Sequence, residues 1–500
     1  MSRKSIAAAL GLALLSILPF ARGLHYAFVF DDHGVIEENA FLAEPANVVK
    51  AATLQTLPDA SIIDSGRPVV ILTYFIDRLF WGLEPAGYRF TNWLLHALAS
   101  VLVWRFLCRF LPSARLAFVC ALLFAWHPLV VEPVQSPAFR EDLLCLVFGA
   151  GFFLQATRPG LRAVGVAACA TWYALALLSK ESAVVFAAVV PVAWWWFPAR
   201  RPDRRVMAGL VAALTLLTAG WAWLVLAGRP VQSVGIEWNG LSFRGGESWW
   251  TMPWLAGWHV GRMIWPHGLS IDYTMRPVSG PLDLRFIVGG IVLVGGAVTA
   301  WMARGKKPSG ALSIAWLFLL FLPVSNLLPL LNPVADRYAY AMLPGAVLLA
   351  GCLLGRWADR AVPVALVVAL VYGGWSFMRV ADWRDDASLW RAALEVTPDS
   401  ARAHTWLGLQ EKAAGNRMAA WEFFSRAEDL NPHDPSPSVN KAILSGEMGD
   451  LSDAETRLRR ILEQYPAHEP ARRNLAYCLR LQGRETEAAA VEAGLDGPGR

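Results

Sequence analysis

The feature that most constrains this chain is a series of long apolar segments in its first 380 residues. A helix that crosses a membrane needs about 20 consecutive, mostly apolar residues. Eleven segments approach that length, and they lie near residues 5–20, 91–110, 115–133, 138–157, 162–179, 182–198, 206–227, 285–303, 311–331, 338–356 and 361–379. We therefore predict an all-α fold whose first part is a polytopic membrane bundle of about 11 spans.

Charged residues are distributed unevenly along the chain and indicate a second domain. They make up 17% of all residues, against about 25% in soluble proteins. Residues 381–500 nevertheless hold 35 of the 85 charged side chains, which is a soluble-like density. We predict a membrane-embedded domain over residues 1–380 and a water-soluble domain over residues 381–500.

Basic residues in the short loops predict the orientation. Lys and Arg accumulate in cytoplasmic loops of membrane proteins. If the N-terminus is cytoplasmic, the loops on that side hold 16 basic residues and two acidic ones. This places the C-terminal domain outside the cytoplasm, as in a periplasmic or extracytoplasmic domain of an inner-membrane protein. The first long outer loop is then 21–90, and a second outer segment covers 228–284.

Two segments have alternative interpretations. Arg3 and Lys4 precede the first apolar run, as in a signal peptide; we favour an uncleaved anchor, because the acidic loop behind it belongs to the candidate site. Residues 249–266 are apolar enough to resemble a further span. Trp250, Trp254 and Trp258 recur there at helical spacing, which favours a helix lying in the outer interface.

The C-terminal domain contains a repeat of 34 residues. Proline, glycine and alanine recur at this period, at Pro398, Pro432 and Pro466, at Gly415, Gly449 and Gly483, and at Ala420, Ala454 and Ala488. A 34-residue period with small residues at fixed places is the signature of tetratricopeptide repeats. Residues 382–397 would form the second helix of a preceding degenerate repeat. We predict an α-solenoid with a concave surface for a peptide or protein; a folded spacer without ligand is the alternative.

The loop after the first apolar segment holds the most informative acidic pair. Asp31 and Asp32 follow the apolar residues 28–30 closely behind a predicted span. Partial burial beside a like charge raises the pKa of a carboxyl group, which suits a general base. The alternative role of this pair is to cap the N-terminus of a helix.

Other ionisable and polar residues gather at the outer ends of the predicted spans. The candidates are His33, Asn92, His96, His127, Glu132, Arg140, Asp142, Lys180, Glu181, Asp272, Tyr273, Asp336 and Arg337. Charged groups at membrane depth are unfavourable unless they are paired or functional. Structural ion pairing would explain Lys180–Glu181 and Asp336–Arg337 taken singly. The convergence of the whole set on one leaflet, opposite the arginine-rich loops, favours a site.

In their order along the chain, these segments resemble a known class of enzyme. The carrying segments are residues 28–33 (FVFDDH), 89–96 (RFTNWLLH), 127–132 (HPLVVE), 140–142 (RED), 179–181 (SKE), 269–273 (LSIDY) and 326–338. The set resembles the GT-C class of membrane glycosyltransferases, and more narrowly the transmembrane and tetratricopeptide-repeat-containing protein O-mannosyltransferases with their bacterial relatives. One departure is Phe139 before Arg140-Glu141-Asp142, where relatives often have Gly-Arg-x-Asp; it leaves the role of Glu141 open.

The resemblance implies a reaction and roles for several residues. A sugar, mannose in the named family, would pass from a polyprenyl-phosphate donor to Ser or Thr hydroxyls of exported protein on the non-cytoplasmic face, with the repeats helping to bind the acceptor. The first-loop acidic pair supplies the base in such enzymes, so that role falls to Asp31 or Asp32. The leaving phosphate needs cations, for which the candidates are Lys180, Arg140 and Arg337.

Other classes of function receive less support. Within the same chemistry, the acceptor could be a glycolipid or cell-wall polymer; a non-catalytic anchored scaffold for the repeats is the rival from another class. We predict no required cofactor and no metal site, because the spacing of Asp31, Asp32 and His33 is not a metal signature, although a divalent ion has suitable ligand types there. The sequence contains no glycine-rich phosphate loop, and nothing in it indicates a nucleic-acid partner.

Overall fold

The computed structural model describes residues 3–227, 236–238, 241–243, 247–328, 330 and 332–494. The chain divides into two compact units. The first comprises the chain up to residue 236 together with 243–269 and 277–385, and the second comprises 237–242, 270–276 and the residues from 386 onward. Each unit is helical, and the strands of the described residues are one short pair, β1 (Ile236–Trp238) and β2 (Leu241–Phe243).

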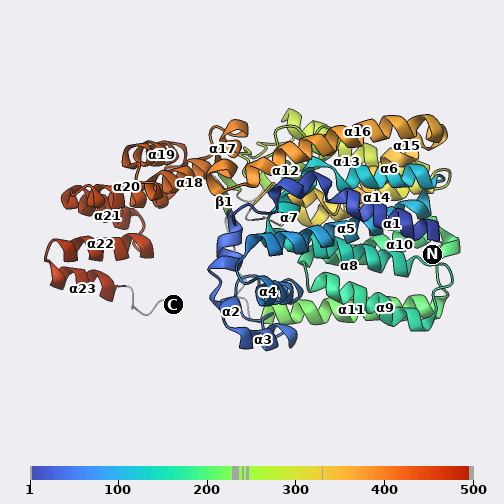
Figure 1. The fold of residues 1–500 in the computed structure, drawn as a ribbon, viewed down its shortest axis with the longest axis horizontal. Helices are drawn as coiled ribbons and strands as arrows, with labels where there is room; N and C mark the ends of the chain where they lie inside the picture. The colour runs from blue at the N-terminus through green and yellow to red at the C-terminus, as the bar shows by residue number, and fades with distance from the viewer. Residues whose placement is uncertain are drawn as a thin grey trace. The chain divides into compact units, whose positions relative to one another are not determined.

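The first unit is a bundle in which most long helices run alongside one another (Figure 1). Its helices are α1 (Arg3–Ser16), α2 (Ala40–Ala43), α3 (Val48–Ala52), α4 (Pro68–Trp81), α5 (Pro85–Phe110), α6 (Ala114–Ala125), α7 (Val131–Gln135), α8 (Arg140–Ala156), α9 (Ala163–Leu177), α10 (Phe186–Trp196), α11 (Arg204–Ala227), α12 (Glu247–Ile264), α13 (Leu284–Ala303), α14 (Pro308–Phe321), α15 (Leu343–Leu354) and α16 (Ala358–Arg379). Prolines at the first turn begin α4, α5 and α14, where the missing N–H group costs no helical hydrogen bond.

Each apolar segment found in the sequence contains a helix, so the predicted membrane bundle is confirmed, and the chain is an integral membrane protein. Among the described residues, five helical stretches are long and apolar enough to cross a membrane: 3–23, 85–110, 204–227, 284–303 and 360–383. A sixth is possible if α6 and the segment 128–135 form one bent span. The remaining apolar helices are shorter than a full crossing, so the number of eleven spans stays a prediction.

The bend between α6 and α7 has a local cause. The two helical segments meet at an angle of 52°. Pro128 lies at the break and Pro133 lies inside the second segment, and proline lacks the N–H group that would continue the helix. The short, irregular stretch 127–139 that results is buried, and it carries several of the predicted site residues.

The loop 21–90, which the sequence predicts to lie on the outer side, is more structured than the sequence suggested. It contains α2, α3 and α4. The search for long apolar segments did not predict these three helices. Helix α4 packs Val70, Ile71, Tyr74 and Phe75 into a buried cluster with residues of the loop and of α8. The loop therefore forms a wall of the bundle at the end where the acidic pair lies.

The second unit is a set of paired helices with the predicted repeat. They are α17 (Asp386–Val396), α18 (Ala401–Ala413), α19 (Arg417–Leu430), α20 (Pro435–Glu447), α21 (Leu451–Gln464), α22 (Glu469–Leu481) and α23 (Glu485–Ala493). Gly415, Gly449 and Gly483 occupy the turns within three pairs at φ angles of 82°, 93° and 77°, a region that favours glycine. Ala420, Ala454 and Ala488 are buried between helices. The predicted α-solenoid is confirmed.

Candidate active site

The loop that follows α1 is held in place by buried polar contacts. Phe30, directly before the acidic pair, adopts a positive φ of 54°. Arg89 of α5 donates hydrogen bonds to the carbonyl oxygens of Tyr26 and Ala27 and to that of Gln135 at 3.0 Å. A buried guanidinium that satisfies three carbonyl groups fixes the loop against the bundle.

Asp32 is fully buried and uses both carboxylate oxygens within the protein. Its Oδ1 accepts hydrogen bonds from the Ser136 hydroxyl at 2.7 Å and the Ala138 amide at 2.8 Å, and its Oδ2 accepts one from the Val29 amide at 3.2 Å. Burial raises the pKa of Asp32 to about 6, against the lowering effects of Arg89 and of these hydrogen bonds. Asp32 thus ties the first loop to the irregular segment 127–139.

Asp31 lines a cavity of about 350 Å³, a volume within the range of small-molecule sites. The cavity brings together residues from five separate parts of the chain. Its lining is Asp31, Val35, Asp64, Arg67, Ala138, Phe139, Glu141, Lys180, Glu181, Ser182, Pro323, Val324, Leu330, Asn332, Arg337 and Tyr338. Asp31, Lys180, Glu181 and Arg337 were predicted as site residues from the sequence, and the structure places all four here.

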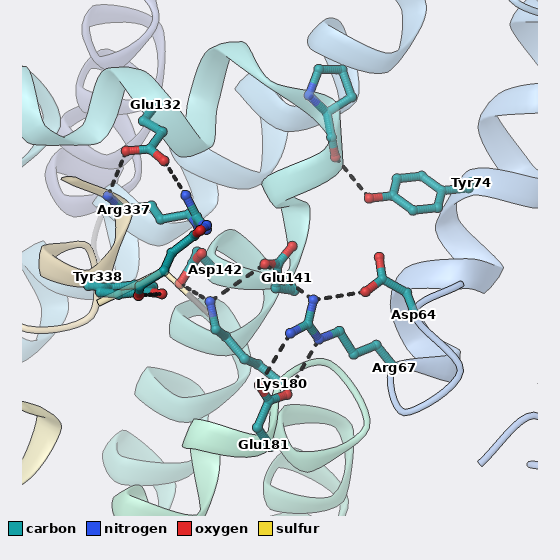
Figure 2. Close-up of polar contacts among 12 residues, drawn as sticks. Asp64, Arg67, Tyr74, Glu132, Glu141, Asp142, Lys180, Glu181, Arg337 and Tyr338 are labelled. Atoms are coloured by element: carbon teal, nitrogen blue, oxygen red, sulfur yellow. Dashed lines mark hydrogen bonds and ion pairs between the residues drawn. The ribbon is translucent and has the colours of Figure 1, made fainter. Parts of the chain in front are cut away.

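Arg67 is the centre of one group of carboxylates in the cavity wall (Figure 2). Its guanidinium lies 2.9 Å from Asp64, 3.2 Å from Glu181 and 3.4 Å from Glu141. Burial raises the pKa of Asp64 to about 6, although Arg67 opposes this effect. One cation therefore faces three acidic side chains. An ion pair with a purely structural role would need only one of them.

Lys180 is the second cation, and Figure 2 shows its amino group directed toward Asp142 and toward Glu141, which Arg67 also contacts. Its Nζ atom lies 2.6 Å from Asp142 and 3.6 Å from Glu141. One oxygen of each carboxylate, Oδ2 of Asp142 and Oε2 of Glu141, is buried without a hydrogen-bond partner. Buried polar atoms are normally paired, so the unpaired oxygen of Glu141, which lines the cavity, favours a functional role for that carboxylate.

Arg337 completes the set of cations from the segment before α15. Its backbone N–H donates to Glu132 at 3.0 Å and its guanidinium pairs with the same carboxylate. The guanidinium carbon also lies 4.0 Å from the centre of the Phe139 ring. Beside it, the Tyr338 hydroxyl donates to the Asn332 carbonyl at 2.8 Å. Glu132 thus positions Arg337 at the cavity without lining it.

Several predicted site residues lie outside the cavity lining. Arg140 points into the protein, where it pairs with Asp77 at 2.6 Å and donates to Asn92 at 2.8 Å. His96 lies 2.9 Å from the Tyr340 hydroxyl and 3.0 Å from the Ala125 carbonyl. These contacts hold both side chains within the bundle, and neither side chain is part of the cavity lining.

The remaining candidates are distributed over other contacts. His33 pairs with Glu37 at 2.6 Å, His127 contacts the Met263 carbonyl at 3.0 Å, and Asp336 pairs with Arg379 at 2.7 Å. Asp272 and Tyr273 belong to the second unit. There Asp272 accepts a hydrogen bond of 2.5 Å from Ser400.

Sequence reasoning missed Asp64 and Arg67 and left Glu141 open. Asn332 and Tyr338 lie in the carrying segment 326–338 but were not predicted as site residues. Arg67 directly precedes Pro68, which begins α4. A charged residue next to a helix-starting proline was the one local feature from which Arg67 could have been chosen as a candidate. Its distance to Glu181 depends on how the loop folds back, 114 residues apart in sequence. No local pattern reports such a contact.

The acidic residues do not form a metal site in the part of the chain that the structure describes. No group of three or more His, Cys, Asp or Glu side chains there is arranged to hold a metal ion. Asp32 is bound to Ser136 and Ala138, whereas His33 is bound to Glu37. The three neighbours 31–33 consequently do not converge on one point.

Comparisons with known proteins identify relatives over most of the chain. Protein O-mannosyl-transferase Tmtc1 of Drosophila melanogaster is 25% identical over 80% of this chain and 59% of its own length. Protein O-mannosyl-transferase TMTC4 of Mus musculus is 26% identical over 83% of this chain and 66% of its own length. The chain is similar to the protein O-mannosyl-transferases. The resemblance predicted from the ordered segments is confirmed, and the chain spans about 60% of the length of the first of these relatives.

The repeats and the fold have matches of their own. The family model "Tetratricopeptide repeat" matches residues 440–499. Among solved structures, ArnT from Cupriavidus metallidurans in the apo state aligns with 88% of this chain and 78% of its own, at 17% identity and a TM-score of 0.41. The same protein bound to undecaprenyl phosphate aligns with 98% of this chain and 88% of its own, at 15% identity and a TM-score of 0.40.

Proposed function

We propose that this protein is a membrane glycosyltransferase that transfers mannose from a polyprenyl-phosphate donor to Ser or Thr hydroxyls of exported protein. The observation that carries the proposal is the cavity in which Asp31 stands with the cations Lys180, Arg337 and Arg67. The similarity of this chain to proteins named O-mannosyl-transferases supports mannose as the sugar and protein hydroxyls as the acceptor. The repeats help to hold the acceptor chain.

In this proposal Asp31 is the base, because it lines the cavity while Asp32 is bound internally. The acceptor hydroxyl attacks the anomeric carbon as Asp31 takes its proton. A bond forms between the hydroxyl oxygen and the anomeric carbon, and the bond from that carbon to the phosphate oxygen breaks on the opposite face. The electron pair leaves with the polyprenyl phosphate, and the configuration is inverted.

The departing phosphate gains negative charge and needs cations held ready for it. Lys180 and Arg337 line the cavity as this role requires, and Arg67 takes the part predicted for Arg140. All three cations are paired with carboxylates before the donor binds. The phosphate therefore competes for them with the carboxylates that they contact, which are Asp142 and Glu141 at Lys180, Glu132 at Arg337, and Asp64, Glu141 and Glu181 at Arg67.

A lipid donor also needs an apolar path for its chain. Leu54 and Leu57 of the first loop, together with α9 and α11, line an apolar cavity of about 300 Å³. Its wall residues Leu177 and Leu178 directly precede the turn that holds Lys180. Part of the isoprenoid would fit here while its phosphate reaches the polar cavity. With the N-terminus in the cytoplasm, both cavities open at the outer leaflet.

The experiment is a transfer assay with purified protein in proteoliposomes. The donor is polyprenyl-phosphate mannose, the acceptor is a peptide rich in Ser and Thr, and the product is detected as a hexose mass shift. We expect transfer by the wild type and none by Asp31→Asn. Asp59→Asn is the matched control, because Asp59 is exposed in the same loop. Full transfer by Asp31→Asn would refute the assignment, and transfer to lipid instead of peptide would refute the acceptor.

A further inference from the structure

Glu141 differs from the other carboxylates that contact the cations of the cavity. Lys180 donates a hydrogen bond of 2.6 Å to Asp142. Arg67 likewise donates one of 2.9 Å to Asp64. Glu141 approaches the same two cations only to 3.6 Å and 3.4 Å, beyond the range of about 2.7–2.9 Å that charge-assisted hydrogen bonds adopt. Each cation therefore has a closer partner than Glu141.

Both contacts of Glu141 end on one oxygen atom. Its Oε1 faces the Nζ atom of Lys180 and the guanidinium of Arg67, and Figure 2 shows the carboxylate between the two cations. Its Oε2 is buried without a hydrogen-bond partner among the described residues. The residue is 3% exposed, and it lines the polar cavity. Glu141 is thus an incompletely satisfied anion at the wall of the site.

This arrangement is unfavourable for the protein taken by itself. Burying a carboxylate costs free energy unless hydrogen bonds or close ion pairs replace the lost water. Both cations are already paired with closer carboxylates, so neither needs Glu141 for its own neutralisation. A buried polar atom that stays unpaired in a native fold calls for an explanation, and the use of the cavity supplies one.

The position of Glu141 is also the position that a bound phosphate would use. Both cations contact a single oxygen of Glu141, so they are close enough to contact a single phosphate group as well. A phosphate held by Lys180 and Arg67 then lies beside the carboxylate. Like charges repel strongly where water is scarce, so Glu141 lowers the affinity of these cations for any phosphate.

The repulsion acts unequally on donor and product. A polyprenyl-phosphate sugar is a phosphodiester with one negative charge. Loss of the sugar leaves a phosphate monoester, which carries a charge of about −1.5 to −2 at pH 7. The cations consequently attract the product more strongly than the donor, and product release limits the turnover of many enzymes. A fixed anion at the cations opposes this tendency, because its repulsion grows with the charge of the phosphate.

We propose that Glu141 weakens the binding of the lipid phosphate at Lys180 and Arg67, so that polyprenyl phosphate leaves the site after the sugar has been transferred. The inference rests on the proposed function, since it takes a polyprenyl phosphate as the product. Glu141 acts on the phosphate through its charge and forms no bond with it. Its part in the cycle is product release, whereas Asp31 takes part in the transfer step.

The test measures the binding of two soluble probes to the purified full-length protein in detergent. Farnesyl phosphate has the charge of the product, and its methyl diester has the charge of the donor. We expect Glu141→Gln to bind farnesyl phosphate about ten times more tightly than the wild type, which corresponds to about 1.4 kcal/mol. The gain for the methyl diester should be smaller. Unchanged or weaker binding of farnesyl phosphate by Glu141→Gln would overturn the proposal.

Two further variants separate the charge of Glu141 from its packing. Glu141→Asp keeps the negative charge, so its affinity for farnesyl phosphate should stay within about twofold of the wild type. Glu84→Gln removes an exposed acidic charge from the first loop, and we expect wild-type affinity from it. Equal tightening in Glu84→Gln and Glu141→Gln would reduce the effect to net charge and refute a local role. Should Glu141→Gln fail to fold, Glu141→Ala takes its place with the same expected direction.

A turnover measurement connects the binding to the reaction cycle. In the transfer assay, added farnesyl phosphate should inhibit Glu141→Gln at about one-tenth of the concentration that inhibits the wild type. Equal inhibition of the two proteins would overturn the proposal and leave the proposed function intact. If farnesyl phosphate binds neither protein, the lipid-phosphate donor of the proposed function fails, and the role of Glu141 fails with it.

Discussion

The carboxylate of Asp32 accepts a hydrogen bond of 2.7 Å from the hydroxyl of Ser136, which lies 104 residues further along the chain. This contact distinguishes Asp32 from its neighbour Asp31, although the sequence gives no reason to assign the two residues different roles. Asp32 is occupied by protein donors and holds the first loop on the irregular segment 127–139. Asp31 is left at the cavity, beside the cations that a lipid phosphate requires.

We expect alanine substitutions of the two aspartates to have different effects. Asp31→Ala should lower the transfer rate by about 100-fold or more, the usual contribution of a general base, with little change in Tm. Asp32→Ala leaves the Ser136 hydroxyl and the Ala138 and Val29 amides without their acceptor. Unpaired buried donors are unfavourable, so it should destabilise the fold by about 3 kcal/mol. Thermal unfolding in detergent and the transfer assay measure both effects.

Equal effects of the two substitutions would contradict the assignment of Asp31 as the base and Asp32 as a structural residue. If Asp31→Ala lowers Tm as much as Asp32→Ala does, Asp31 has a structural role as well. If Asp32→Ala keeps its Tm but loses transfer, the base is Asp32. Asp59→Ala, in the same loop and exposed, is the control for both variants.

The pKa of Asp32 gives a prediction for the pH dependence of stability. Burial raises this pKa from 3.8 to about 6 in the folded state. Between these two values the folded state retains a proton that the unfolded state has lost. The free energy of unfolding consequently falls as pH rises through this window, by about 3 kcal/mol for this group. Above about pH 6 this decrease in the free energy of unfolding is complete, and below pH 3.8 it has not begun.

Asp32→Asn cannot titrate and lacks this contribution. When pH rises from 4.5 to 7, the Tm of the wild type should therefore fall relative to the Tm of Asp32→Asn. Thermal unfolding of the two proteins at a series of pH values checks the prediction. Parallel curves for the two proteins would show that the pKa of Asp32 is not raised in the folded state.

Helices and repeats were predictable because their signals are local. Apolar runs report the positions of helices such as α5 and α11, and the recurrence of Gly415, Gly449 and Gly483 reports the repeats. The site was predictable only as a collection of residues at one leaflet. Lys180 and Arg337 reach the cavity as expected, whereas Arg140 pairs with Asp77 on α4. That contact depends on a helix that the sequence analysis did not predict.

Arg67 and Arg140 should therefore differ in what their removal changes. Arg67→Ala removes a cation from the cavity and leaves three carboxylates facing each other, so we expect the KM for the lipid donor to rise about tenfold with a smaller change in kcat. Arg140→Ala removes the cation that pairs with the buried Asp77, which keeps its hydrogen bond from the Thr91 hydroxyl; loss of the cation should cost about 3–5 kcal/mol of stability. Steady-state kinetics and thermal unfolding separate the two effects.

Arg78→Ala is the matched control for this pair. Arg78 also lies in α4, and it donates a long hydrogen bond of 3.4 Å to the Ile36 carbonyl. We expect nearly wild-type kinetics and Tm from it. A donor KM that changes with Arg140→Ala but not with Arg67→Ala would reverse the assignment of the phosphate site.

Asp272 supplies the last prediction, because it joins the segment 270–276 to the first helix of the repeats. Its carboxylate accepts a hydrogen bond of 2.5 Å from Ser400, and its carbonyl accepts one of 3.3 Å from Thr397. Ser400 is also the N-cap of α18, where its hydroxyl oxygen accepts from the Ala403 amide at 2.9 Å. Asp272 therefore orients the residue that begins this helix.

Asp272→Ala should loosen the start of α18 without unfolding the other repeats. Loss of a charge-assisted hydrogen bond of about 1.5 kcal/mol corresponds to roughly tenfold faster amide exchange when exchange follows local opening. Hydrogen exchange of the full-length protein, followed by peptide mass spectrometry, measures this over residues 401–413. Asp434→Ala is the control, since Asp434 is itself the N-cap of α20 and accepts a hydrogen bond from the Ser436 amide; it should accelerate exchange in α20 alone. If Asp272→Ala abolishes transfer while exchange in α18 is unchanged, Asp272 acts on substrate and not on the repeats.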